Sequence, residues 1–183
     1  MKCSMLTSVF LFLSILFLSH HTKAQALDLK NSNLEKTNGK GGFFWWSHQA
    51  KGKGAAIFSI EKIDVAENSS KSLRCEVQSL GEKPWFVSTA FNSVFEIQAN
   101  EEITVSFAAK RGSEGTGKMG LVFQSSKKGS FQNKQFYLSE DWSVFTHTFT
   151  MDHANKKGQL KFWYLEAGTI YFLDEVSVQK ETF

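Results

Sequence analysis

Adjacent pairs of carboxyl groups recur along the chain, and carboxyl groups can act as acid and base in sugar hydrolysis. The pairs are Glu101-Glu102, Glu140-Asp141 and Asp174-Glu175. Glycoside hydrolysis needs two carboxyl groups that face each other across one cleft. Neighbouring residues of a strand point to opposite faces, so none of these pairs can itself form that couple. Carboxylates that are distant in the sequence could still converge, so a glycan-active enzyme stays open as an alternative.

Two other catalytic motifs are incomplete. The segment Gly112–Lys118 matches a phosphate-binding loop up to its lysine, but Met119 stands where the metal-binding hydroxyl is required. The apolar residues that follow predict a strand, whereas such a loop leads into a helix. The histidines that follow the first 26 residues are His48, His147 and His153, and their spacing does not match a zinc motif. The sequence therefore favours neither a nucleotide site nor a zinc site.

The strongest binding chemistry lies in the segment Gly158–Leu165. Alternation along a strand separates one face, with Leu160, Phe162 and Tyr164, from another, with Gln159, Lys161 and Trp163. A tryptophan that shares a face with glutamine and lysine should be partly exposed. An exposed indole ring can stack on the C–H face of a pyranose, while amides bind the hydroxyl groups. The alternative is a tryptophan at the edge of a sheet or under a loop.

The segment Gly168–Val178 reads as the last strand, and it carries an acidic residue among apolar ones. Simple alternation places Ile170, Phe172, Asp174 and Val176 on one face. A buried carboxylate without a partner is costly, so Asp174 should have one. The partner could be a backbone N–H group, a lysine or a hard cation.

These residues must be positioned by many short strands, because turn-forming segments interrupt the chain and no helical period is sustained. Such a pattern is typical of a single all-β sandwich domain. The expected strands are Phe43–His48, Ala55–Ile63, Lys71–Gln78, Trp85–Phe91, Ser93–Gln98, Glu101–Lys110, Lys118–Ser125, Lys134–Leu138, Trp142–Met151, Gly158–Leu165 and Thr169–Gln179.

The first 26 residues read as a secretory signal peptide, which leaves residues 27–183 as the folded domain. Lys2 precedes a short apolar run, and small residues at 24 and 26 suit cleavage. Without Lys2 and Lys23 the chain has 19 basic and 18 acidic residues, a net charge of +1, which gives no support for nucleic-acid binding. Only Cys75 remains after cleavage, so no intrachain disulfide is expected.

Several short motifs resemble those of one protein family. Gly168–Val178 is similar to the family's closing strand, and Asn31–Glu35 to its opening N-G-x-F-E, with two substitutions. Trp142–Thr150 is similar to its W-x-x-y-x-x-x-F-t segment, and Gly158–Trp163 to its G-Q-h-x-F-x segment. Together they resemble carbohydrate-binding modules of the family 4/9/22 type, over nearly all of residues 27–183. The resemblance implies a galactose-binding-like jelly roll.

This resemblance also implies roles for particular residues. In these modules the first acid of the closing strand binds a structural calcium ion, with backbone carbonyls near the N-terminus, so Asp174 and Glu35 are the candidate ligands. Outward positions of the G-Q-h-x-F-x strand contact the sugar, which implicates Trp163 and Gln159. Further candidates for sugar contacts are Trp85, Asn92, Gln124 and Phe131. Tryptophans at the positions of Trp46 and Trp142 are packing residues.

The sequence thus predicts a secreted module, extracellular or periplasmic, that binds a polysaccharide or oligosaccharide and is not an enzyme. A small glycan-active hydrolase or lyase on the same sandwich is one alternative, and a structural or adhesion domain is another. We expect a monomer that associates with a glycan-degrading enzyme system. Five lysines would suit an acidic polysaccharide, although solvated basic loops are the commoner explanation for them; they are Lys40, Lys51, Lys53, Lys127 and Lys128.

Overall fold

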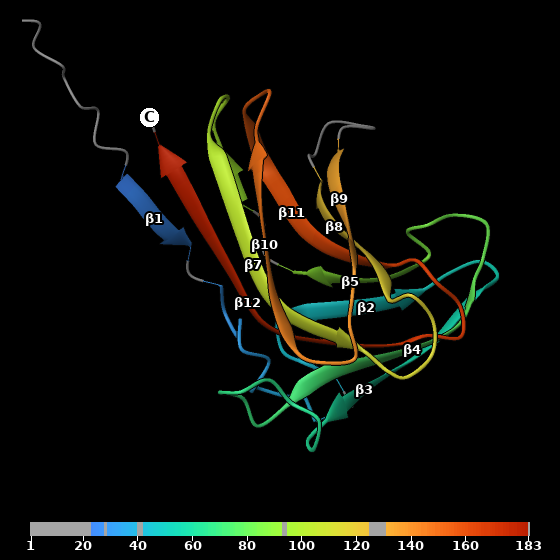
Figure 1. The fold of residues 1–183 in the computed structure, drawn as a ribbon. Coiled ribbons are helices and arrows are strands. Elements are labelled where there is room, and N and C mark those ends of the chain that lie inside the picture. Colours follow the sequence, from blue (N-terminus) through green and yellow to red (C-terminus); the bar gives the residue numbers. More distant parts are fainter. Residues whose placement is uncertain (1–22, 28, 40–41, 93–94, 125–130, 183) are drawn as a thin grey trace, which may run out of the picture.

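The computed structural model describes residues 23–27, 29–39, 42–92, 95–124 and 131–182. These residues form two antiparallel sheets that pack face to face (Figure 1), and the described part of the chain contains no helix. No helix in this part of the chain is therefore long and apolar enough to cross a membrane. The prediction of a single all-β sandwich is confirmed.

Sheet I contains the strand that closes the fold. In spatial order it consists of β10 (Ser143–Thr150), β7 (Glu102–Arg111), β12 (Ile170–Thr182), β4 (Ser72–Leu80) and β3 (Gly54–Glu61). A short strand, β1 (Lys23–Leu27), pairs with the end of β12 beside the C-terminus (Figure 1). The predicted start of the folded domain, residue 27, is the last residue of β1; most of the predicted signal peptide lies outside the described residues.

Sheet II contains the predicted sugar-binding strand. In spatial order it consists of β2 (Trp46–Ala50), β5 (Val87–Phe91), β11 (Asn155–Tyr164), β8 (Lys118–Gln124) and β9 (Phe131–Tyr137). The short strand β6 (Phe95–Ile97) pairs with the start of β11. Gly112–Gly117 is a loop between two strands, and Lys118–Gln124 is a strand. This confirms the strand that the apolar residues after the incomplete phosphate-loop motif predicted.

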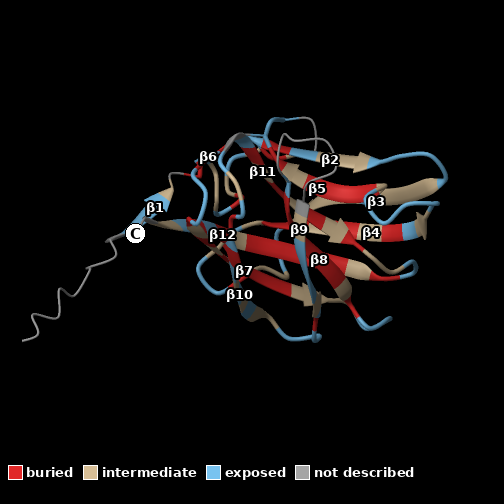
Figure 2. Ribbon diagram, turned by 90° about the horizontal axis from the view of Figure 1, so that it is seen from above, coloured by how far each residue is buried: buried red, intermediate tan, exposed pale blue. Residues whose placement is uncertain are grey.

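The core lies between the two sheets and is rich in aromatic rings. From β11 it takes Leu160, Phe162 and Tyr164, which are all fully buried, so the alternation predicted for this strand is confirmed. Phe107 of β7 meets Phe162 across the core with ring centroids 5.1 Å apart. Figure 2 shows buried residues concentrated in the strands of both sheets, with exposed residues in the loops. Burial of this apolar surface is the main stabilising term, and Cys75, the cysteine among the described residues, is buried and free.

One predicted feature of the closing strand is wrong. Ile170, Phe172 and Asp174 lie on the outer face of sheet I as expected, but Val176 belongs to the core with Val178. The cause is a β-bulge between Asp174 and Ser177, where Glu175 has a φ angle of +47°. One extra residue in the strand makes each side chain after it point to the face opposite to the one that simple alternation predicts.

Candidate functional site

Strand register places three of the predicted sugar-binding residues, Trp163, Gln159 and Gln124, on the outer face of sheet II, the face that points away from the core. Residues that pair directly across antiparallel strands project to the same side. One row across the sheet contains the key tryptophan; in spatial order it is Gln49, Ser88, Trp163, Gly120 and Gln135. An indole ring therefore lies on the central strand of the sheet, between a serine and a glycine.

A second row, two residues along each strand, centres on a cation. In spatial order it contains Ser47, Ala90, Lys161, Val122 and Asn133. Partial burial lowers the pKa of the Lys161 ammonium group, and repulsion from Lys51 lowers it further. Among the described residues no carboxylate forms an ion pair with Lys161. The centre of the face thus holds a partly desolvated positive charge.

A third row supplies amides. Gln159 pairs with Gln124, which in turn pairs with Phe131. The Gln159 side-chain Nε2 donates to the carbonyl of Phe91 at 3.3 Å, which leaves its carbonyl oxygen available to accept a hydroxyl. Asn92 follows β5 directly and is exposed. For Phe131 the structure describes the backbone alone, so the predicted contact of its side chain stays a prediction.

Two tryptophans form an aromatic surface at one end of this face. The rings of Trp85 and Trp163 have centroids 6.0 Å apart at an interplanar angle of 48°. A Cβ atom placed on Gly120 would lie 3.5 Å from Trp163 Cβ and 3.9 Å from Cε3 of its ring, so the indole extends over this glycine. Trp85 is 41% exposed, and Trp163 is half-buried. Both rings therefore keep some surface exposed to solvent.

Trp85 lies in the loop before β5, and two side chains of the face hold its backbone. Gln49 Nε2 donates to the Trp85 carbonyl at 3.1 Å and to Ser88 Oγ at 2.8 Å. Ser88 Oγ donates to the same Trp85 carbonyl at 3.3 Å. The loop tryptophan is therefore positioned by rigid strands, which reduces the entropy lost when a ligand binds.

Sequence reasoning missed several residues of this face, namely Gln49, Asn133, Gln135 and Tyr137. Asn133, Gln135 and Tyr137 are exposed and alternate along β9. Their period of two was a signal that could have revealed them. Gln49 could not have been found in this way, because only the register of β2 against β5 places it beside Trp163.

The two tryptophans assigned to packing lie elsewhere. Trp46 is 4% exposed, packs against Phe91 in the core with ring centroids 5.2 Å apart, and donates from Nε1 to the Asn31 carbonyl at 3.1 Å. Trp142 is half-buried near sheet I, where its ring lies 6.3 Å from that of Phe172. Its Nε1 donates to Asp64 Oδ1 at 3.0 Å. Neither ring is part of the outer face of sheet II.

Asp174, the predicted metal ligand, is fully buried beneath the outer face of sheet I. Its Oδ1 accepts from Glu175 N at 2.7 Å, whereas Oδ2 has no hydrogen-bond partner among the described residues. Burial raises the pKa of this carboxyl to about 6. The backbone N–H of Glu175, the buried Ser69 hydroxyl and the backbone of Ala66 lie close to this carboxyl and offset part of the rise in its pKa. These oxygens suit a hard cation.

Glu35, the second predicted ligand, has its carboxylate engaged by protein donors. It accepts from the backbone N–H groups of Ser70 at 2.6 Å and Lys71 at 3.2 Å, and from the Ser70 hydroxyl. Burial raises the pKa of Glu35, but these hydrogen bonds outweigh it and the pKa lies below its usual value. No cluster of three or more His, Cys, Asp or Glu side chains occurs among the described residues. A cation here would depend on Asp174 and neutral oxygens.

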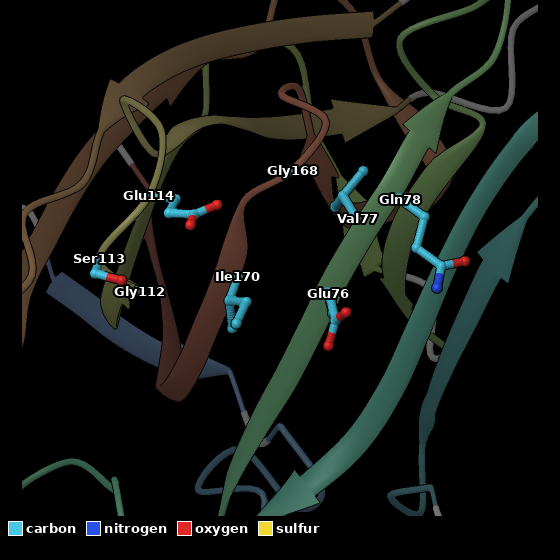
Figure 3. A pocket seen from close by; sticks show the side chains of 8 residues that line it. All are labelled: Glu76, Val77, Gln78, Gly112, Ser113, Glu114, Gly168 and Ile170. Atoms are coloured by element: carbon cyan, nitrogen blue, oxygen red, sulfur yellow. The ribbon is translucent and has the colours of Figure 1, made fainter.

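A pocket of about 380 Å³ opens on sheet I beside the start of β12, and two carboxylates line it (Figure 3). Glu76 comes from β4 and Glu114 from the loop after β7, with Ile170 between them. Glu76 is ion-paired with Arg74 at 2.9 Å. The Glu166 carboxylate holds the loop by accepting from the backbone of Thr116 and Gly117. The pocket is preformed, but it lies on the sheet opposite to the aromatic face.

Neither a protein-family model nor a curated protein sequence matches this chain. Similarity appears only in three dimensions, and at low sequence identity. The xylan-binding domain CBM22-1 from Paenibacillus barcinonensis Xyn10C superposes with a TM-score of 0.56 and 14% identity, over 81% of this chain and 90% of that one. A family 4 carbohydrate-binding module superposes with a TM-score of 0.60 and 20% identity, over 84% of this chain and 99% of that one.

A third similar structure is the arabinose-bound α-L-arabinofuranosidase MgGH51, with a TM-score of 0.65 and 12% identity. The match covers 85% of this chain but only 26% of that longer enzyme. Identities this low establish the fold alone. The chain therefore has the β-sandwich jelly-roll fold that carbohydrate-binding modules of the family 4 and 22 type share.

Proposed function

We propose that this protein is a secreted, non-catalytic module that binds a polysaccharide or oligosaccharide across the outer face of sheet II. The observation that carries the proposal is the aromatic pair Trp163 and Trp85, 6.0 Å apart on a face that also carries several amide side chains. Stacking on the indole rings supplies apolar contact, and the amides supply hydrogen bonds to hydroxyl groups.

The assigned contacts follow from strand order. Trp163 is the main platform, with Trp85 beside it. Gln159 and Gln124 lie two rows away along the strands and can bind hydroxyl groups of the next sugar units. Asn92 and Phe131 extend the same row toward the two edges of the sheet. Because the face is open, a chain can cross it without ending there.

A structural calcium ion bound by Asp174 is part of this proposal. The unpaired Oδ2 in a fully buried position supports it, because a cation would supply the missing partner. Glu35 is a further ligand candidate, although its carboxylate already accepts from Ser70 and Lys71. Calcium would fix the bulged part of β12 against the loop that contains Ser69, and so stabilise the module rather than contact sugar.

The hydrolase or lyase alternative has one specific observation in its favour, the pocket that contains Glu76 and Glu114. Such an enzyme would release new reducing ends from a polysaccharide, and Glu114→Gln should abolish that release. An adhesion domain would instead associate with itself or with another protein through the aromatic face, without any need for glycan. We favour binding without catalysis, because the aromatic face and the carboxylates lie on opposite sheets.

Affinity electrophoresis of the protein against a panel of soluble polysaccharides tests the proposal. Retardation by at least one polysaccharide, lost in Trp163→Ala and kept in Trp142→Ala, is the expected result. The panel should include a xylan, a mixed-linkage glucan, a polyuronate and a sulfated galactan. If none of them retards the wild-type protein, glycan binding by this face is wrong.

A further inference from the structure

The charges of the two sheets are distributed unequally. The five strands of the continuous path of sheet II contain five lysines and no aspartate or glutamate; the lysines are Lys118, Lys134, Lys156, Lys157 and Lys161. The five strands of the continuous path of sheet I contain six acidic residues, namely Glu61, Glu76, Glu102, Asp174, Glu175 and Glu181, and four basic ones, Arg74, Lys110, Arg111 and Lys180, a net charge of −2 against +5 on sheet II. On sheet II only the short strand β6 carries an acid, Glu96. A net charge near zero for the whole domain conceals this asymmetry.

Lys161 occupies the centre of the candidate binding face. It lies between Gln159 and Trp163 on β11, roughly 7 Å from each along the strand. Its neighbours across the strands are Ala90 and Val122, which are too short to reach the ammonium group and carry no charge. Val122 is fully buried although it belongs to this face, so neighbouring side chains cover it, as the aliphatic part of a lysine can.

Further lysines lie around the aromatic end of the face. Lys51, at the turn after β2, is close enough to repel Lys161. The Lys83 ammonium group lies 5.9 Å from the ring of Trp85. The nearby carboxylate of Glu82 forms an exposed ion pair with Lys53 at 3.7 Å. Lys161 itself has no carboxylate partner among the described residues. Like charges placed close together cost stability, so the pairing of Lys161 with Lys51 favours a role in binding an anion.

We propose that the ligand of this face is an anionic polysaccharide, whose acidic group binds Lys161 while a sugar ring of the same chain stacks on Trp163. This inference rests on the proposed function and names its ligand class. The acidic group is a uronate carboxylate or a sulfate ester, because a lysine ammonium group binds either as a point charge. A charge-assisted hydrogen bond at a partly desolvated position is stronger than one between neutral groups.

Titration calorimetry with a polyuronate, a sulfated galactan and a neutral xylan or glucan tests this inference. Wild-type protein should bind one of the anionic polymers, and bind it more weakly as salt is added. Lys161→Gln should lower that affinity about tenfold, the scale of one charge-assisted hydrogen bond, and leave any binding of the neutral polymers unchanged. Lys161→Arg should retain the anionic preference. The two anionic polymers separate carboxylate from sulfate recognition.

Lys62→Gln is the matched control, because it removes the same charge from an exposed position after β3, on the other sheet. It should leave the affinity unchanged, and all variants should keep the wild-type melting temperature. If a neutral polymer binds at least as tightly as both anionic ones, or if Lys62→Gln weakens anionic binding as much as Lys161→Gln, the inference is overturned while glycan binding stands. If no polymer binds, the proposed function itself fails.

Discussion

The outer faces of the two sheets are built from similar alternating strands, yet their polar side chains differ in how they are paired. On sheet I several polar side chains of neighbouring strands pair with one another. Thr104 and Thr148 share a hydrogen bond of 2.7 Å across β7 and β10, and Ser106 and Thr146 share one of 2.8 Å. Charged groups on that side are paired too, for example Asp64 with Lys110 at 2.7 Å.

On sheet II the corresponding positions hold amides, an indole ring and a lysine that has no ion-pair partner among the described residues. The contrast extends to the two half-buried tryptophans. Trp142, beside sheet I, donates its indole N–H to a carboxylate and packs against Phe172. Trp163, on sheet II, lies over a glycine and beside a second tryptophan. Polar groups that are paired internally stabilise a fold, whereas groups left available to solvent can bind a ligand.

The largest expected effect is a loss of stability that differs between the inner and outer faces of sheet II. Trp46→Ala removes a ring from the core, and should lower the free energy of unfolding by about 3–5 kcal/mol. Trp163→Ala, on the other face of the same sheet, should have a clearly smaller effect. Urea denaturation of both variants measures the difference. Equal destabilisation by the two changes would mean that Trp163 is also a core residue.

His48, on the inner face of sheet II, should make the free energy of unfolding depend on pH. His48 stacks on Phe58 with centroids 4.9 Å apart, and burial lowers its pKa to about 4 from 6.5. The unfolded chain therefore takes up a proton first, so stability conferred above pH 6.5 is lost as the pH falls toward 4. The loss should reach about 3 kcal/mol.

His48→Gln isolates this contribution, because the other titrating groups cancel when its unfolding curves are compared with those of the wild type. The difference in unfolding free energy between the two proteins should change by about 3 kcal/mol between pH 7 and pH 4. A difference that is constant over this range would mean that His48 is protonated at no extra cost in the folded protein.

Sheet I should respond to calcium rather than to sugar. At a calcium concentration of 100 times its dissociation constant, binding to the folded state alone would raise the unfolding free energy by about 2.7 kcal/mol. Asp174→Asn should abolish that gain. Thermal unfolding with calcium and with a chelator measures it. Identical melting temperatures of the wild-type protein under both conditions would remove calcium from the account.

The sequence predicted the faces of a regular strand well, but not what depends on distant contacts. Period-two alternation correctly separated Phe162 from Trp163, because β11 is regular over that stretch. The same rule failed at Val176, since the bulge at Glu175 is imposed by neighbouring segments, among them Ser32, whose carbonyl accepts from Val176 N at 2.9 Å. Strand register likewise decides which remote side chains share a face, so Gln49 was missed.

The most direct test of the whole account compares Trp163→Ala with Trp142→Ala in a quantitative binding assay against the best polysaccharide of the panel. Loss of the stacking surface in Trp163→Ala should weaken binding by about 1–3 kcal/mol, with folding retained. Trp142→Ala should bind like the wild-type protein and lose stability instead. Full affinity in Trp163→Ala, together with lost affinity in a folded Trp142→Ala, would show that the ligand binds at sheet I and would contradict the account.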